Sequence, residues 1–107
     1  MMTDPTEDPF GHVTAFEWDE QKRASNFQKH GIDFSDLSEF LDGDLVVGRS
    51  DREGEVRFEL FGVVEGQVIA AVCTVRGNRC RWISARPARR DERKRYHSRV
   101  PRLSPQG

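Results

Sequence analysis

The chain has 107 residues, which fits one domain with a single modest core. Charged residues make up 33% of it and the apolar residues fall in blocks, so the composition is that of a globular protein. No stretch approaches the roughly 20 apolar residues that a membrane helix requires. The acidic N-terminus lacks the basic and apolar regions of a signal peptide, so we expect a cytoplasmic protein.

The net charge of −1 conceals an uneven distribution of charge. Residues 1–20 carry six acidic groups and no basic ones, and residues 21–75 carry ten acidic and six basic groups. Residues 76–107 carry eleven basic groups against two acidic ones. A basic segment of this density indicates a polyanionic partner, with nucleic acid as the first candidate. A solvated basic helix, or a binding surface for an acidic protein segment, remains the alternative.

The two cysteines, Cys73 and Cys80, have no nearby set of Cys and His residues, so the sequence predicts no zinc site. Both are expected to be core residues without a disulfide between them. No Gly-rich phosphate loop is present, which argues against a nucleotide-binding fold. We therefore expect no cofactor and no metal.

The N-terminal third predicts a tail, a short strand and two helices. Residues 1–15 hold Pro and Gly without periodicity and predict a tail, and Phe16–Trp18 predicts a strand. Asp19 is a good N-cap for a helix that runs to His30, and the glycine that follows fits the C′ position. Further expectations are a narrow apolar side of this helix at Ala24 and Phe27, and a second helix capped by Ser35 with Leu37, Phe40 and Leu41 facing inward.

The remaining chain predicts a meander of four strands and a final helix. Turn formers at residues 52–54, 65–66 and 77–78 separate the strands. The expected strands are Leu45–Asp51, Glu55–Val64, Gln67–Arg76 and Arg79–Arg86. Pro87 fits the first turn of a helix over Ala88–Val100. The single domain spans residues 16–100, and residues 101–107 form a C-terminal tail.

Two-residue hairpin turns would fix the register of these strands. Thr74 then faces both Arg57 and Arg81, and Val72 faces Ile83, so an arginine row crosses three strands. A slip of one residue would destroy the row. The predicted core face carries Val56, Phe58, Leu60, Ile69, Ala71, Cys73, Val75, Cys80 and Trp82. The opposite face carries Glu55, Arg57, Glu59, Thr74, Arg76, Arg79 and Arg81, which is either an open solvated face or a binding surface. The predicted fold is α+β, with a twisted antiparallel sheet, two N-terminal helices and one C-terminal helix.

Several blocks of the sequence resemble one known family. FEWDEQKRASNFQKHGIDF (Phe16–Phe34), GEVRF (Gly54–Phe58) and RWISAR (Arg81–Arg86) are similar in order and content to the motifs of BrnT-family toxins, and ARRDERKRYH is similar to their last helix. The resemblance runs over about three quarters of the chain. Two positions depart from it: Pro87 stands where a basic residue is common, and Cys73 where an aromatic residue is frequent.

The resemblance implies a RelE-like fold and an endoribonuclease that cleaves RNA without a metal and inhibits translation. It also implies a cognate antitoxin that is BrnA-like, a ribbon-helix-helix protein through which the complex reaches its operator DNA. A homodimer within a heterotetramer is compatible with it. We expect acidic antitoxin residues to cover the arginine row or the last helix.

Metal-free RNA cleavage requires a base for the ribose 2′-hydroxyl, stabilisation of the phosphorane and an acid for the leaving 5′-oxygen. Arginine suits the phosphorane because its planar fork binds phosphate oxygens bidentately. The catalytic candidates are Arg57, Arg81, Lys29, His30 and Glu55. The candidates for RNA contacts are Lys22, Thr74, Arg76, Arg79, Arg86, Arg89, Arg90, Arg93 and Tyr96.

Several of these candidates also have a purely structural explanation. His30 either transfers a proton or complements the dipole at the end of its helix. Glu55 either orients Arg57 or acts as the base, and Tyr96 either stacks on a nucleobase or packs on the sheet. A module that binds nucleic acid or protein without catalysis is the alternative function.

Overall fold

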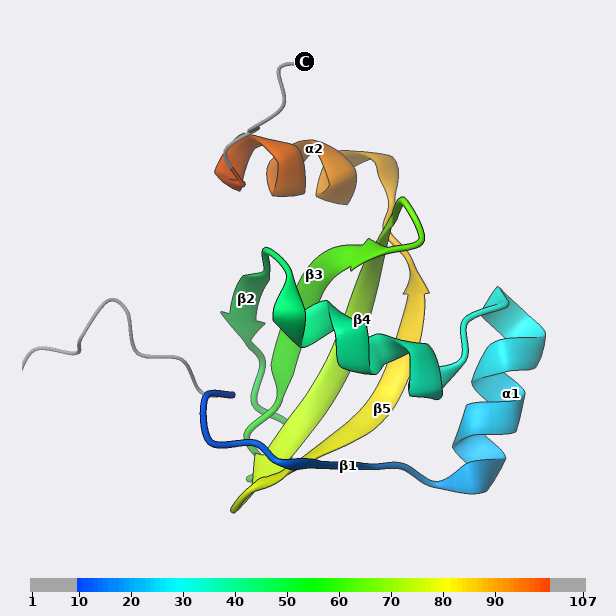
Figure 1. Cartoon of the computed structure of the whole chain (residues 1–107), viewed down its shortest axis with the longest axis vertical. Helices are drawn as coiled ribbons and strands as arrows, with labels where there is room; N and C mark the ends of the chain where they lie inside the picture. Colours follow the sequence, from blue (N-terminus) through cyan, green and yellow to red (C-terminus); the bar gives the residue numbers. More distant parts are fainter. Residues whose placement is uncertain (1–9, 101–107) are drawn as a thin grey trace, which may run out of the picture.

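The computed structural model describes residues 10–100, and within them the side chains of residues 41 and 42 are not described. The predicted α+β class is confirmed: five strands form one sheet in the order β1-β5-β4-β3-β2, with three helices around it (Figure 1). The elements are β1 (Ala15–Glu17), α1 (Glu20–His30), the 3₁₀ helix η1 (Phe34–Asp42), β2 (Val46–Arg49), β3 (Phe58–Val64), β4 (Gln67–Arg76), β5 (Arg79–Pro87) and α2 (Arg90–Arg99).

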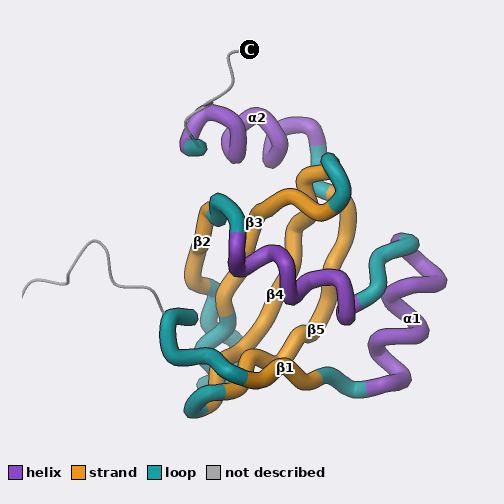
Figure 2. The backbone as a smooth tube through the Cα atoms, viewed as in Figure 1, coloured by secondary structure: helices purple, strands orange, loops and turns teal. Residues whose placement is uncertain are grey.

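The sheet is mixed, whereas the sequence predicted a wholly antiparallel one. β2 to β5 form the expected antiparallel meander, but β1 pairs with β5 in parallel, Glu17 opposite Arg81. In the chain, β1 is separated from the meander by both N-terminal helices. In the sheet, it lies at the edge next to β5, the last strand of the meander (Figure 2). A three-residue strand carries too little pattern to show which edge it will occupy.

Helix α1 has the predicted ends but not the predicted buried side. The Asp19 carboxylate accepts from the backbone N–H groups of residues 21 and 22, and Gly31 closes the helix with φ 74°. Phe27 is 54% exposed and Ala24 is exposed, whereas Asn26 is buried. The expected apolar side is therefore wrong, because α1 lies beside the edge of β5 instead of over the apolar face of the sheet (Figure 1).

Helix η1 supplies the cover of the core face. Its N-cap is Asp33, not the predicted Ser35; the Asp33 carboxylate accepts from the Ser35 backbone N–H at 3.0 Å and pairs with Arg23 Nε at 2.8 Å. The Arg23 guanidinium holds the pKa of Asp33 well below its usual range. Leu37 and Phe40 face inward as predicted. The side chain of Leu41 lies outside the described residues.

The meander follows the predicted turns with shorter strands at its start. β3 begins at Phe58 instead of Glu55, and Arg52 and Glu55 form an isolated bridge beside the turn. Pro87 is the last residue of β5, not the start of the final helix, which begins at Arg90. Pro87 pairs with Ile69 where β1 no longer flanks β5, and a missing N–H is tolerated at such an edge.

A β-bulge interrupts the pairing of β4 with β5. Thr74 faces Arg81 and Cys73 faces Trp82 as predicted, but Val72 faces Ser84 and not Ile83. Ile83 is therefore the extra residue on β5, and the residues after it change faces. Ala85 joins Trp82 in the core, while Arg86 is turned to the outer face.

The core lies between η1 and the predicted face of the sheet. Leu60, Ile69, Ala71, Cys73, Cys80 and Trp82 are buried there, and Phe58 and Val75 are partly buried against them. Val56 is exposed because it precedes β3 and belongs to no strand. Both cysteines are free thiols. Two residues of the segment predicted as an N-terminal tail are part of the fold: Phe10 is buried in this cluster, and Ala15 is the first residue of β1. Residues 1–9 and 101–107 of the predicted tails lie outside the described residues.

A second, smaller cluster anchors α2 to the other face of the sheet. It consists of Val68, Ala88 and Tyr96, with Val46, Phe61 and Val100 packed against them. α2 thus covers one end of this outer face and leaves the rest of it uncovered (Figure 1). None of the described helices is long and apolar enough to cross a membrane.

One buried amide ties α1 to the sheet. Asn26 Nδ2 donates to the Ile32 carbonyl at 3.2 Å, and the Ala85 backbone N–H donates to Asn26 Oδ1 at 3.1 Å. β1 pairs with β5 only over residues 79–81, so Asn26 satisfies an edge N–H that no strand reaches.

Replacing Asn26 by Ala should lower the free energy of unfolding by about 2 kcal/mol, because two buried backbone groups lose their partners. Urea denaturation of the variant and of Gln28→Ala, an exposed position on the same helix, measures the difference. Equal stability of the two variants would show that Asn26 does not hold α1.

Candidate active site

Two neighbouring grooves on the outer face of the sheet share one lining residue, Ile83. The α1 groove, about 410 Å³, lies between α1 and β5. The sheet groove, about 300 Å³, lies over β3 to β5. The α1 groove is lined by Asp19, Gln21, Lys22, Ser25, Asn26, Lys29, His30 and Ile83. The sheet groove is lined by Ser50, Arg52, Arg57, Glu59, Val72, Ile83 and Ser84.

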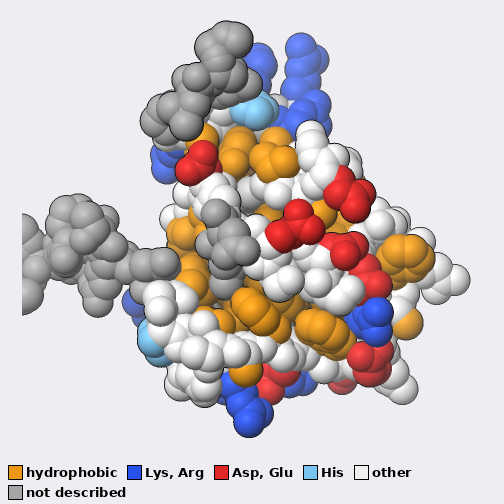
Figure 3. Space-filling view, viewed as in Figure 1, with side chains coloured by type: hydrophobic (Ala, Val, Ile, Leu, Met, Phe, Trp, Pro, Cys, Tyr) orange, Lys and Arg blue, Asp and Glu red, His pale blue; other side chains and the backbone are white. Residues whose placement is uncertain are grey.

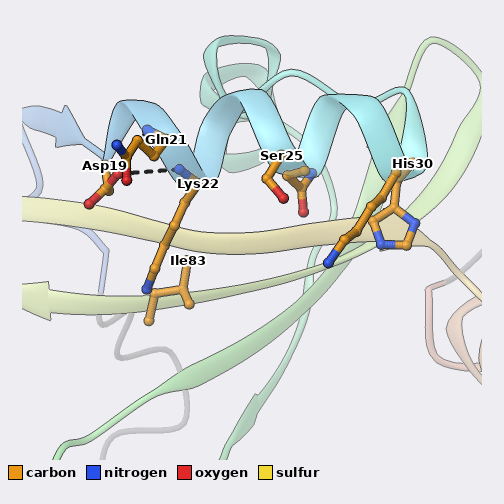
Figure 4. Close-up of a pocket in the computed structure, with 8 residues that line it drawn as sticks. Asp19, Gln21, Lys22, Ser25, His30 and Ile83 are labelled. Atoms are coloured by element: carbon orange, nitrogen blue, oxygen red, sulfur yellow. Dashed lines mark hydrogen bonds between the residues drawn. The ribbon is translucent and has the colours of Figure 1, made fainter.

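The α1 groove gathers the predicted basic residues of the first helix. Lys22 and Lys29 are seven residues apart, about two helical turns, so they lie on one side of α1. Figure 4 shows Lys22, Ser25 and His30 projecting from α1 toward the sheet, with Ile83 beneath Lys22. Among the side chains that the structure describes, no carboxylate lies at ion-pair distance from Lys22, Lys29 or His30. The two exposed lysine ammonium groups are available to an anionic ligand, and His30 lies beside them.

The sheet groove contains Arg57, which the sequence placed in the arginine row. Its side chain is half-buried, and its Nε donates to Glu55 Oε1 at 3.1 Å. The predicted pairing of Arg57 with Thr74 falls one residue beyond the recorded ladder, which ends at Phe58 and Cys73. Arg52 and Ser84 lie on the same groove and were not predicted as site residues.

Two carboxylates each hold a pair of arginines on the outer face. Glu55 accepts from Arg57 and, through its other oxygen, from Arg76 at 3.1 Å. The two guanidinium groups, that of Arg57 foremost, lower the pKa of the Glu55 carboxyl. This arrangement makes Glu55 a weak base and a good anchor for Arg57, so it favours the orienting role over the role of base.

Glu17 is the second carboxylate that holds two arginines, and it was not among the site residues predicted from the sequence. Its two oxygens accept from Arg79 at 3.3 Å and from Arg81 at 3.4 Å. Glu17 reaches these arginines because β1 runs parallel beside β5. Arg57 lines the sheet groove, whereas Arg79 and Arg81 line neither of the two grooves.

Thr74 lies between the two arginine pairs but is 3% exposed. Its hydroxyl donates to the Val56 carbonyl at 2.8 Å. The hydroxyl holds the segment before β3 against β4, and that segment carries Glu55 and Arg57. Thr74 therefore positions the site from beneath.

The candidates on the last helix lie apart from the grooves. Tyr96 is 5% exposed, and its hydroxyl donates to the Asp44 carbonyl at 2.9 Å, which matches the packing explanation for this residue. Arg89, Arg90 and Arg93 are exposed, and Lys and Arg side chains gather over α2 in Figure 3. This helix presents positive charge at one end of the molecule.

Arg86 is engaged within the protein. Its two terminal nitrogens donate to the two carboxylate oxygens of Glu92 at 2.8 and 2.9 Å. Glu92 is buried, and the Arg86 guanidinium lowers its pKa to about 2. Glu92 also accepts from the Arg89 backbone N–H at 2.8 Å, so the ion pair fixes the start of α2.

Sequence reasoning missed Glu17, Arg52, Ser84 and the role of Asn26. The contacts of Glu17 and Asn26 with β5 can be recognised only once the positions of β1 and α1 beside β5 are known. Within residues 10–100, no group of three or more His, Cys, Asp and Glu side chains is arranged to hold a metal ion.

A comparison with protein-family models decides the family. Residues 18–92 match the model described as the ribonuclease toxin, BrnT, of type II toxin–antitoxin systems. The chain belongs to this family. Its members are ribonuclease toxins paired with an antitoxin, so this BrnT-family chain is a ribonuclease toxin with a cognate antitoxin. A search of curated proteins returns no match.

The Arg86–Glu92 pair should make the stability of the toxin depend on pH. The folded-state pKa of Glu92, about 2, lies below its value in the unfolded chain, so the contribution of the carboxylate is complete above about pH 5 and is lost as the pH falls toward 2. Glu92→Gln should cost roughly 2–3 kcal/mol near neutral pH. The difference from the unmodified protein should shrink steadily below pH 5.

Chemical denaturation from pH 7 to pH 2 measures this dependence, with Asp91→Asn as the exposed neighbouring control. A difference for Glu92→Gln that stays constant over the whole range would contradict the assigned ion pair.

Proposed function

We propose that the toxin is a metal-independent endoribonuclease whose RNA-cleaving site comprises the α1 groove and the sheet groove. The observation that carries this proposal is the placement of unpaired cations and a carboxylate-held arginine around one shared residue, Ile83. RNA cleavage would inhibit translation in the cytoplasm. The fold that this proposal implies is RelE-like, which rests on the family assignment.

In the proposed mechanism Arg57 stabilises the phosphorane. Its fork can donate to two phosphate oxygens while Glu55 holds its Nε side. An arginine fixed before the substrate arrives stabilises developing charge without reorganisation at the moment of reaction. Arg52, on the same groove, adds positive charge beside it.

Lys29 and His30 supply the proton transfers. One takes the proton of the ribose 2′-hydroxyl as its oxygen attacks phosphorus, and the other gives a proton to the 5′-oxygen as the P–O5′ bond breaks. The products are a 2′,3′-cyclic phosphate and a 5′-hydroxyl. Histidine suits this work because its unperturbed pKa lies near neutrality.

The remaining cations hold the RNA strand. Lys22 binds phosphate in the α1 groove, and Arg76, Arg79 and Arg81 extend the positive surface along the sheet. Arg89, Arg90 and Arg93 attract RNA from the end of the molecule. Arg86 and Tyr96, which the sequence also gave as candidates for RNA contacts, form hydrogen bonds within the protein that anchor α2.

The antitoxin partner we propose is a BrnA-like ribbon-helix-helix protein whose acidic residues cover the basic face. Operator DNA would be bound through the antitoxin, and a toxin homodimer within a heterotetramer is the expected assembly. Adding the purified antitoxin to a cleavage assay should abolish activity at equimolar protein, and unchanged cleavage would contradict this part of the proposal.

Cleavage of a single-stranded RNA in excess EDTA tests the enzymatic proposal. The unmodified toxin should cleave, and Arg57→Ala should lower kcat by about 100- to 1,000-fold while the protein stays folded. Arg57→Lys should recover only part of the activity, because lysine lacks the bidentate fork. Arg90→Ala is the control: it should raise KM and weaken the salt dependence of binding with kcat nearly unchanged.

Two results would contradict the proposal. Full activity of Arg57→Ala would remove the sheet groove from the chemistry. Binding of RNA without any cleavage would favour the alternative function, a non-catalytic binding module.

A further inference from the structure

The floor between the two grooves is apolar and belongs to neither hydrophobic cluster. Ile83 and Val72 are both half-buried, and neither is part of the core cluster or of the cluster beneath α2. Their exposed surface faces the grooves, Ile83 lining both of them and Val72 the sheet groove. Packing of the protein itself therefore does not account for an isoleucine at this position.

Ile83 lies at the β-bulge, on the face of the sheet that carries the grooves. Cys73 pairs with Trp82 and Val72 pairs with Ser84, so Ile83 is the unpaired residue between them. β-Bulges often lie beside functional sites. In regular pairing Ile83 would face Val72 directly, and Arg86 would point into the core.

Cationic side chains stand on both sides of this apolar floor. Lys22 and Lys29 stand in one wall, with His30 beside them, and Arg52 and Arg57 stand in the other. Single-stranded RNA has the matching pattern, since anionic phosphates alternate with flat bases whose faces are apolar. A surface with an apolar platform between two groups of cations fits one nucleotide with its flanking phosphates.

We propose that Ile83, with Val72 beside it, is the platform on which the nucleobase next to the scissile phosphate packs. The inference rests on the proposed function, because it takes the two grooves as the RNA site. The phosphates on either side of that nucleotide contact the lysine wall and the arginine wall. Ile83 thus contacts the substrate and favours binding of a nucleotide that carries a base. A purine should bind better than a pyrimidine, because its larger ring covers more of the platform.

The test measures binding, not cleavage, with non-cleavable 2′-O-methyl oligonucleotides. One strand carries adenine at every position, one carries uracil, and a third has the same backbone and charge but no bases. Fluorescence anisotropy at fixed salt gives Kd for the unmodified toxin, for Ile83→Ala and for Ile83→Thr, which keeps the branched shape but exposes a hydroxyl. Val63→Ala, at an exposed apolar position of β3 outside both grooves, is the matched control.

Both Ile83 variants should bind the adenine strand about 5- to 20-fold more weakly than the unmodified toxin, because apolar contact with the base is lost. The uracil strand should lose less, and the base-free strand should bind all proteins equally. Ile83→Leu should restore most of the affinity for the adenine strand. Val63→Ala should bind every strand like the unmodified toxin.

An equal loss of affinity for the base-free strand, or no loss for the adenine strand, would overturn the platform. In either case the unmodified toxin still binds RNA and the proposed function stands. Failure of the unmodified toxin to bind any of the strands would instead contradict the proposed function itself.

Discussion

Trp82 and Ala85 both lie in the core, although an odd number of steps separates them on one strand. Regular alternation would send one of them to the outer face. The bulge at Ile83 resolves this conflict by adding one residue to β5 opposite Val72. As a result Arg86 reaches Glu92 and fixes α2, and the Ala85 N–H points to Asn26 and fixes α1. Ile83, the extra residue, lies on the face of the grooves. The arrangement of both helices around the site depends on this one irregularity.

The basic surface combines two kinds of cation. The arginines of the sheet are held by Glu17 and Glu55, each of which bridges two guanidinium groups. The lysines and the histidine of α1 have no such partner among the described residues. An arginine that is held in place suits the negative charge that develops on the phosphorane at one defined position. A lysine with its flexible side chain suits the phosphates of a flexible RNA strand. The net charge of the whole chain is close to neutral, but its basic side chains are concentrated on this surface.

The sequence predicted the meander and the register near its turns because two-residue turns and alternation are local signals. Cys73 faces Trp82 and Thr74 faces Arg81 as the turn at residues 77–78 requires. The prediction failed where distant segments meet. The parallel pairing of β1, and with it the role of Glu17, depends on tertiary contacts that a short strand does not encode by itself. The bulge could have been inferred from Trp82 and Ala85 only if both were already known to be buried.

The candidate site shows the same division. Arg57, Lys29 and His30 came from motifs and lie on the grooves, but the motifs alone did not separate cations that face the grooves from Arg86, which an internal carboxylate occupies. Distinguishing them requires knowledge of the position of Glu92, six residues further along the chain and on a different element.

In the proposed function, the α1 groove and the sheet groove form one RNA site on the two sides of Ile83. Amide chemical-shift mapping of the isotopically labelled toxin with a non-cleavable 2′-O-methyl oligonucleotide tests it most directly. Residues 22–30, Arg52, Arg57 and residues 83–84 should shift together with one affinity, while η1 stays unchanged. Shifts confined to α2, or separate affinities for α1 and for the sheet residues, would contradict it.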